Sequence, residues 1–282
     1  MTNLSPRVLL FDSGVGGLSI AEAIWRQMPA MQLSYLADNA FFPYGDQPEK
    51  RVIERCVTLV QKALEDFPAD MVVIGCNTAS TVVLPSLRAA ISLPVVGVVP
   101  AIKPAASLSR NRSIGLLATP ATVDRPYIDR LIEEYASDCQ IVRVGSSDLV
   151  RMAEASLEQG SVPVEGLRPI IEPFVQAKVD TVVLGCTHFP LVRSSLQQAM
   201  PETLNWVDSG EAIARRVQYL AEQQGVAVSL EERAAHELLF TGNEPVGLDA
   251  WIARMGKGRC HLTTDFPGSQ VTPRRGLIRS DG

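Results

Sequence analysis

The chain of 282 residues lacks any apolar stretch near the roughly 20 residues that a membrane-spanning helix needs. Residues 1–7 also lack a basic segment followed by an apolar core, which is the pattern of a secretion signal. We therefore expect no association with a membrane and a cytoplasmic location.

Clustered positive charge is lacking as well. The chain has 26 Lys and Arg residues against 31 Asp and Glu, so its formal net charge is −5, and the basic residues are scattered along the sequence. Such a chain has no general attraction to phosphate backbones. A nucleic-acid partner is not expected.

Cysteine and histidine are scarce. Three histidines and an odd number of cysteines occur, without the short spacings of a disulfide framework or a zinc ribbon. We expect reduced thiols, and because no close Cys or His spacing supports a metal site, we expect no bound metal. The cysteines are Cys56, Cys76, Cys139, Cys186 and Cys260.

Short apolar runs that alternate with amphipathic stretches make up most of the chain, of which 46% is hydrophobic. This pattern is typical of an α/β protein in which helices cover both faces of a doubly wound parallel sheet. Gly14, Gly16 and Gly17 indicate a tight exit from the first strand into a helix over 18–28. The predicted strands are 8–11, 33–37, 71–75, 95–98, 114–118, 141–144, 181–185 and 204–207.

An internal repeat is the most informative feature of the sequence. Residues 70–78 and 180–188 are near copies, and a weaker similarity relates 8–13 to 114–119. Repetition of whole strand sets predicts two α/β domains related by internal pseudo-symmetry, with the active site between them.

The predicted domain boundaries follow from this repeat. The first domain comprises 1–97 plus 208–282 and the second comprises 98–207. Because the chain crosses twice between them, we expect a hinge that closes around a small substrate. The tail from Thr263 is rich in Gly, Pro, Ser and Arg and lacks periodicity, which predicts a loose surface segment.

Cys76 and Cys186 occupy the same place in the two copies. Each follows an apolar strand and a glycine, and each precedes a predicted helix start. The exposed N–H groups of a helix N-terminus favour a thiolate, so we expect lowered pKa values for these two thiols. The other three cysteines have the ordinary interpretation of small, inert packing residues.

Two matched thiols suit a reaction that inverts a carbon centre. In racemisation the α-proton leaves from one face and another proton arrives at the opposite face, so one thiolate acts as base while the opposed thiol acts as acid. A hydrolase or decarboxylase would need one thiol and a base, for which Cys186 and His188 are candidates. A binding protein that closes on a small acid would not need twinned thiols.

Several motifs make the resemblance specific: the chain resembles the glutamate racemases of the aspartate/glutamate racemase superfamily, in particular the proteobacterial type. The match runs from about Arg7 to Asp208. The motifs are Phe11-Asp12-Ser13-Gly14-Val15-Gly16-Gly17, Pro43-Tyr44-Gly45, Gly75-Cys76-Asn77-Thr78, Val96-Gly97-Val98-Val99-Pro100-Ala101-Ile102-Lys103-Pro104, Ile114-Gly115-Leu116-Leu117-Ala118-Thr119-Pro120-Ala121-Thr122 and Gly185-Cys186-Thr187-His188-Phe189-Pro190-Leu191.

The resemblance implies the roles of the site residues. Cys76 and Cys186 would be the acid/base pair, with Asp12 beside the first and His188 beside the second, and Glu154 would be a further catalytic residue near the second. The implied substrate-binding residues are Asp12, Ser13, Pro43, Tyr44, Gly45, Asn77, Thr78, Thr119, Thr122, Thr187 and His188.

The implied activity is the racemisation of glutamate, supplying D-glutamate for peptidoglycan synthesis. Neutral donors at helix starts suit a dicarboxylate. A pyridoxal cofactor would need a Schiff-base lysine, and the motifs near the two cysteines contain none, so no cofactor is predicted. A peptidoglycan precursor is a possible regulator, as in some proteobacterial relatives. The sequence leaves open a homo-oligomer and another substrate of the superfamily, such as aspartate.

Ordinary structural interpretations also stand for the candidate residues. Asp12 and Ser13 could cap the helix that follows, and His188 could cap the next one. Tyr44 could simply pack over a turn, and Glu154 could lie on a solvated helix face. The glycine run 14–17 lacks the full spacing of a dinucleotide-binding or nucleotide-binding loop.

Overall fold

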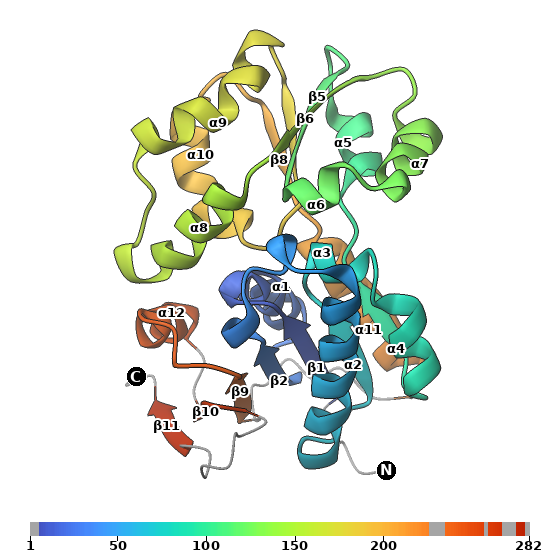
Figure 1. The fold of residues 1–282 in the computed structure, drawn as a ribbon, viewed down its shortest axis with the longest axis vertical. Helices are drawn as coiled ribbons and strands as arrows, with labels where there is room; N and C mark the ends of the chain where they lie inside the picture. Colours follow the sequence, from blue (N-terminus) through green and yellow to red (C-terminus); the bar gives the residue numbers. More distant parts are fainter. Residues whose placement is uncertain (1–5, 226–234, 257–258, 267–274, 280–282) are drawn as a thin grey trace.

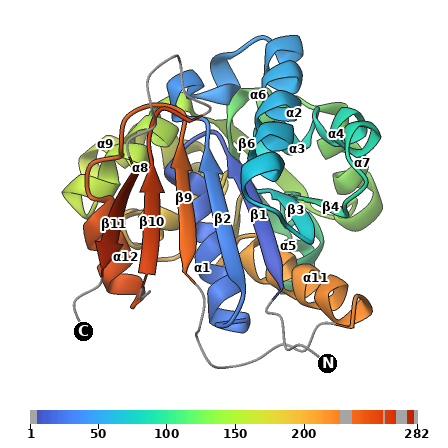
Figure 2. The same ribbon diagram turned by 90° about the horizontal axis from the view of Figure 1, so that it is seen from below.

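A computed structural model describes the chain except for residues 1–5, 226–234, 257–258, 267–274 and 280–282. Its first sheet has the strand order β11-β10-β9-β2-β1-β3-β4, which Figure 2 shows from left to right. All of these strands run parallel except β11, which pairs antiparallel with β10. The strands are β1 (Arg7–Asp12), β2 (Gln32–Ala37), β3 (Met71–Ile74), β4 (Val95–Gly97), β9 (His236–Phe240), β10 (Arg259–Thr263) and β11 (Arg275–Arg279).

The second sheet has the order β6-β5-β7-β8 and is entirely parallel. It lies above the first sheet in Figure 1 and is formed by the intervening part of the chain. Its strands are β5 (Ser113–Ala118), β6 (Gln140–Gly145), β7 (Thr181–Leu184) and β8 (Asn205–Val207).

The two sheets share one topology. The order β2-β1-β3-β4 in the first corresponds to β6-β5-β7-β8 in the second, so β3 and β7, which precede the two cysteines, occupy equivalent positions. The pairing lengths match too, because β1 pairs with β3 over as many residues as β5 pairs with β7. The predicted pseudo-symmetric α/β fold is confirmed.

Helices cover both faces of each sheet. In the first unit α1, α11 and α12 pack on one face and α2 and α4 on the other; in the second, α8, α9 and α10 oppose α5 and α7. The helices are α1 (Leu18–Gln27), α2 (Glu49–Asp66), α3 (Asn77–Ser80), α4 (Leu84–Ala90), α5 (Ile102–Leu108), α6 (Pro120–Val123), α7 (Pro126–Tyr135), α8 (Ser147–Gln159), α9 (Val164–Gln176), α10 (Arg193–Ala199), α11 (Gly210–Gln223) and α12 (Leu248–Met255), with short 3-10 helices η1 (Val15–Gly17), η2 (Asn39–Phe41), η3 (Tyr44–Asp46) and η4 (Phe189–Val192).

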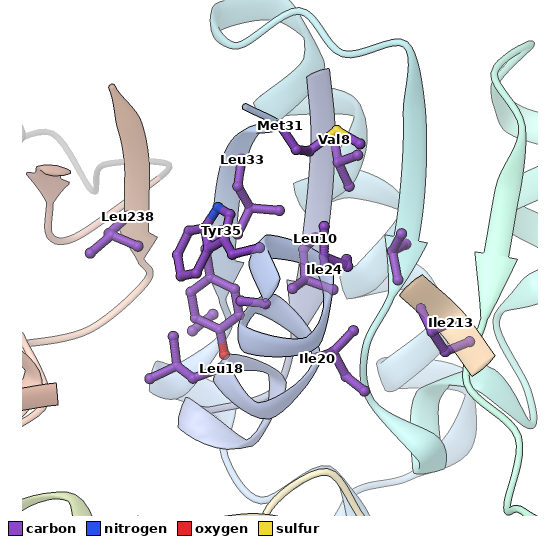
Figure 3. Packing of buried hydrophobic residues seen from close by; sticks show 14 of the residues in the cluster. Val8, Leu10, Leu18, Ile20, Ile24, Met31, Leu33, Tyr35, Ile213 and Leu238 are labelled. Carbon is purple, nitrogen blue, oxygen red and sulfur yellow. The ribbon is translucent and has the colours of Figure 1, made fainter. Parts of the chain in front are cut away.

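Alternation along β1 explains this layering. Val8 and Leu10 point to the face covered by α1, where Ile20 and Ile24 pack against them (Figure 3), whereas Leu9 and Phe11 face the α2 side. Burial on both faces accounts for the nearly continuous apolar strands that the sequence shows. The strands end next to the second sheet, where Asp12 and Cys76 lie.

The C-terminal part of the chain differs from the prediction. The sequence suggested a loose surface segment from Thr263, but Phe266 is buried against Phe67, and β11 extends the first sheet beyond β10. Residues 267–274 and 280–282 of this tail lie outside the described residues. The prediction failed because pairing with β10 supplies order that periodicity does not encode.

No helix among the described residues is long and apolar enough to cross a membrane. The chain passes from the first sheet to the second after β4 and returns after β8. These crossings lie near the predicted domain boundaries, which remain a prediction.

Candidate active site

Cys76 lies at the carboxyl end of β3. Gly75 donates its N–H to the carbonyl of Phe11 at 2.7 Å, which keeps the segment in register with β1 until the cysteine is reached. Cys76 then caps α3, and its Sγ accepts the N–H of Ala79 at 3.5 Å. The thiol is buried, and Ser13 Oγ lies 3.7 Å from its sulfur. The end of β1 thus places a hydroxyl beside this thiol.

Cys186 has the equivalent position after β7. Gly185 donates its N–H to the carbonyl of Leu117, again at 2.7 Å. The sulfur is buried and lies 3.7 Å from Nδ1 of His188. His188 precedes η4 but makes no side-chain capping hydrogen bond, so the capping interpretation is wrong. Its ring faces the thiol instead.

Both thiols line one narrow cavity between the two sheets. Most of the residues predicted from the motifs line it, and Ser147 and Val150 of α8 do so without having been predicted. The lining residues are Ser13, Pro43, Tyr44, Gly45, Cys76, Asn77, Thr78, Thr119, Ser147, Val150, Cys186 and His188.

Asp12, at the end of β1, lies behind this lining. Its Oδ1 accepts the backbone N–H of Ser13 at 2.5 Å and the Ser13 hydroxyl at 3.2 Å, while Thr187 Oγ1 donates to its Oδ2 at 2.9 Å. Burial raises the pKa of Asp12, although the positive charge of His188 and the Thr187 hydrogen bond oppose the rise. The carboxylate therefore joins the two units.

Glu154 lies on α8 and completes the other half of the site. Its Oε2 lies 2.7 Å from Nε2 of His188 and accepts the backbone N–H of Val15 at 3.0 Å. These contacts contradict the interpretation of Glu154 as part of a solvated helix face. Val15 belongs to η1 of the first unit, so the hydrogen bonds of this carboxylate also connect the two units.

The close contact between the two units explains the glycine run after β1. A Cβ at Gly16 would lie 2.3 Å from Nδ1 of His188, and one at Gly14 would lie 2.7 Å from Oε2 of Glu154. Side chains there would push the second unit away from the thiols. The run serves a close approach of the two units rather than a phosphate loop.

The electrostatics of Cys76 differ from the prediction. Burial raises the pKa of this thiol, and the negative charge of Asp12 raises it further, while the hydrogen bond from Ala79 opposes the shift. The sequence predicted a lowered pKa from the following helix. That helix has only four residues, so its dipole cannot offset the desolvation of a buried thiolate.

His188 is the cation of the site. Burial disfavours its charged form, but hydrogen bonds and negative charge from Cys186 and Glu154 outweigh burial and raise the pKa of His188 well above its usual range. The ring therefore holds a proton readily between the Cys186 sulfur and the Glu154 carboxylate.

Neutral donors surround the remaining wall of the cavity. Nδ2 of Asn77 is buried without a hydrogen-bond partner in the part of the chain that the structure describes, which is costly unless a ligand accepts its hydrogens. The hydroxyls of Thr78 and Thr119 lie 3.0 Å apart, and Thr122 Oγ1 lies 2.9 Å from Thr119 Oγ1. Figure 1 shows α3, which carries Asn77 and Thr78, and α6, which carries Thr122 and directly follows Thr119, meeting between the sheets. The site offers hydroxyls and an amide to an anion.

The hydroxyl of Tyr44 does not belong to these free donors. It donates to Oδ2 of the buried Asp38 at 2.8 Å, and Arg55 Nη2 donates to Oδ1 of the same carboxylate at 2.7 Å. Tyr44 therefore does more than pack over a turn, because its hydroxyl binds Asp38 while the residue lines the cavity. Asp38 directly follows β2 and Asp12 ends β1, and that position at a strand end was the signal available in the sequence.

Two further contacts were also missed. Phe42 packs its ring 5.4 Å from that of His188, and Ser147 Oγ donates to the Asp46 carboxylate at 2.9 Å. Among the described residues no group of three or more His, Cys, Asp or Glu side chains has an arrangement that could hold a metal ion. No lysine of the described segments lines the cavity.

Comparisons with known proteins agree with this geometry. Residues 17–217 match the Asp/Glu/hydantoin racemase family. A glutamate racemase of Shewanella loihica is 51% identical over 253 residues, which are 90% of this chain and 94% of the relative. One of Glaesserella parasuis is 52% identical over 215 residues, or 76% and 80% of the two chains.

A solved structure extends the likeness to the fold. Escherichia coli glutamate racemase, crystallised with L-glutamate and the activator UDP-MurNAc-Ala, has a TM-score of 0.82 at 44% identity and covers 89% of this chain and 96% of its own. The family match, the related sequences and the similar fold thus all point to the same group of proteins. The chain belongs to the Asp/Glu/hydantoin racemase family and is an isomerase of its glutamate racemase branch.

Proposed function

We propose that this protein interconverts L-glutamate and D-glutamate without a cofactor, with Cys76 and Cys186 as the two acid/base groups. The observation that carries the proposal is that both thiols line one cavity from equivalent positions of two similar sheets. Such a placement provides one proton-transfer group for each face of an α-carbon held between them.

The proton count balances for one turnover. The thiolate of Cys186 removes the α-proton of one enantiomer and becomes a thiol, leaving a carbanion. The thiol of Cys76 then protonates the opposite face and becomes a thiolate. The other enantiomer reacts through the same steps in reverse order, so both cysteines serve as acid and as base.

His188 provides the proton acceptor for Cys186. The Nε2–H of His188 donates to Glu154, an assignment made from the hydrogen-bond network, and Nδ1 faces the Cys186 sulfur, where it can take the proton of the thiol. Proton transfer to Nδ1 gives a thiolate beside an imidazolium. Glu154 stabilises that positive charge.

Cys76 has a different proton acceptor. Ser13 Oγ lies between its sulfur and Oδ1 of Asp12, so a proton that leaves the thiol passes through the hydroxyl towards the carboxylate. The raised pKa of Asp12 suits a group that must accept this proton. The raised pKa of Cys76 suits a group that starts the reaction as an acid.

The neutral donors of the cavity support a dicarboxylate substrate. Asn77 directly follows Cys76, and its unpaired amide can donate to the α-carboxylate as negative charge develops during proton removal. The threonine hydroxyls contributed by α3 and by the start of α6 supply further donors from both units.

The experiment incubates the purified protein with L-glutamate in D₂O without added cofactor and follows optical rotation together with deuterium at the α-carbon. We expect rotation to fall to zero while deuterium enters. Cys139→Ser, which changes a cysteine outside the cavity, is the matched control and keeps full activity. Turnover of L-aspartate but not of glutamate would favour an aspartate racemase instead. Release of ammonia or CO₂ instead would favour the hydrolase or decarboxylase.

The cellular role follows as a further part of the proposal: supply of D-glutamate for peptidoglycan, in the cytoplasm. Support for this compartment comes from the free thiols Cys56, Cys76, Cys139 and Cys186, which persist under reducing conditions. The activator bound to the Escherichia coli relative suggests regulation by a peptidoglycan precursor here too. Addition of UDP-MurNAc-Ala should raise kcat/KM, and no response would argue against regulation by this precursor.

A further inference from the structure

Asp38 is a fully buried carboxylate that does not line the cavity. It follows β2, and its backbone N–H donates to the carbonyl of Asp12 at 2.8 Å, so it lies beside the end of β1. A buried charge is costly unless it is paired and hydrogen-bonded. The groups that satisfy Asp38 therefore show what this carboxylate holds in place.

Three side chains from separate elements donate to Asp38. Arg55 of α2 makes two bonds, from Nε at 2.5 Å and from Nη2 at 2.7 Å, while Thr241 Oγ1, at the end of β9, donates at 2.7 Å. The third donor is the hydroxyl of Tyr44 in η3, at 2.8 Å. The carboxylate thus ties the cavity segment 43–45 to a helix and to two strands of the first sheet.

The hydrogen bond of Tyr44 determines how this segment meets the cavity. Its hydroxyl is occupied by Asp38, and burial together with the charge of Asp38 raises the pKa of Tyr44, so the phenol stays protonated as a donor. The ring is then fixed, and with it Pro43 and Gly45, which line the cavity on either side. A Cβ at Gly45 would lie 3.4 Å from that of Thr119, so this wall closely approaches the second unit.

We propose that Asp38 and Arg55 are positioning residues that set the affinity for the substrate by holding the 43–45 wall, leaving proton transfer to the cysteines. The proposal rests on the function proposed above. The hydrogen bonds of the thiols involve Ser13, Ala79 and His188, none of which contacts Asp38 or Arg55 through a side-chain hydrogen bond in the described part of the chain. Loosening the wall should therefore weaken binding more than chemistry.

A second ion pair of the same sheet provides a matched control. Asp70 accepts two bonds from the Arg7 side chain, at 2.7 and 3.3 Å, and one from its backbone N–H at 2.9 Å. This pair joins β1 to the residue before β3 at the strand ends opposite the cavity. It has the same residue types as the Asp38 pair but touches no part of the site.

The experiment compares Asp38→Asn, Arg55→Lys and the control Asp70→Asn. For each protein we measure kcat and KM for L-glutamate, the Kd of D-glutamate by calorimetry, and the melting temperature. We expect Asp38→Asn to raise KM and Kd about tenfold, the size of one lost charged hydrogen bond, and to change kcat by less than about threefold. Asp70→Asn should lower the melting temperature and leave KM and Kd unchanged.

Arg55→Lys keeps the test decisive if Asp38→Asn does not fold. Lysine preserves the charge but cannot make the two-point contact, so it should raise KM and Kd to a smaller extent. Unchanged KM and Kd in the folded variants would overturn the proposal, as would losses no different from those of Asp70→Asn. Binding without turnover by the unsubstituted protein would overturn the proposed function alone, and absence of glutamate binding would overturn both.

Discussion

The two halves of the site have a similar backbone but different side chains beside the thiol. Each thiol follows a strand and a glycine, and each glycine makes the same 2.7 Å hydrogen bond to the neighbouring strand. Beside Cys76 stands a hydroxyl backed by Asp12, whereas beside Cys186 stands an imidazole backed by Glu154. Duplication thus placed the sulfurs symmetrically, while the side chains around them diverged.

This divergence makes the halves dependent on each other. Thr187, which follows Cys186, donates to Asp12 in the Cys76 half, and Val15, near Asp12, donates to Glu154 in the Cys186 half. Neither carboxylate is held only by its own unit. The comparison therefore yields three predictions. They concern variants that lose a thiol, a hydrogen bond between the two units, or a charge.

The largest effect is expected from removal of either thiol. Cys76→Ala and Cys186→Ala should each lower kcat for racemisation by about 10³-fold, because one face of the α-carbon loses its acid or base. The remaining cysteine can still remove a proton and return it to the same face. Each variant should therefore exchange the α-proton of one enantiomer with D₂O without inverting it, and the two variants should exchange opposite enantiomers.

Proton NMR in D₂O with each enantiomer measures this exchange separately from racemisation. Exchange should be faster in Cys76→Ala, since this variant retains the thiol that His188 serves directly. Exchange of the same enantiomer by both variants would contradict the opposed placement of the thiols. Cys139→Ser again serves as the control for altering a cysteine outside the cavity.

Local sequence signals account for much of the fold and the site. Apolar runs predicted the strands from β1 to β8, and the repeat predicted that Cys76 and Cys186 stand at equivalent strand ends. Both predictions depend on periodicity and on neighbours along the chain, which the sequence displays directly.

Features that arise between distant segments were not predicted. The strands β9, β10 and β11 extend the first sheet, but they depend on pairing rather than on a strong pattern. The raised pKa of Cys76 results from burial and from Asp12, which lies far away in sequence. Asp38 and Arg55 were missed for the same reason, because their importance arises only where β2, α2 and η3 meet.

A smaller effect is expected from the hydrogen bond that crosses from Thr187 to Asp12. This bond lowers the pKa of Asp12 against the effect of burial, so Thr187→Val should raise that pKa further. More Asp12 is then protonated at a given pH, and the acid limb of the kcat/KM profile should move to higher pH. Near the midpoint of that limb we expect a loss of about tenfold, as for one charged hydrogen bond.

Thr187→Ser provides the matched comparison, because it restores the hydroxyl without the methyl group. Its pH profile should coincide with that of the unsubstituted protein. An acid limb that stays in place in Thr187→Val would show that Asp12 does not supply the ionisation on which the Cys76 half depends.

The third effect concerns the charge of His188 and appears in stability rather than turnover. The folded-state pKa of this ring lies above its unfolded value of about 6.5, so its protonation stabilises the folded state fully below that pH and ceases to do so as the pH rises through the folded-state pKa. Urea unfolding should therefore show that His188→Gln costs most near pH 6. The cost should shrink at higher pH by about 2 kcal/mol, the size of a charged hydrogen bond. A difference that stays constant with pH would mean that the ring is neutral between Cys186 and Glu154, and the two halves would then be alike in holding no cation.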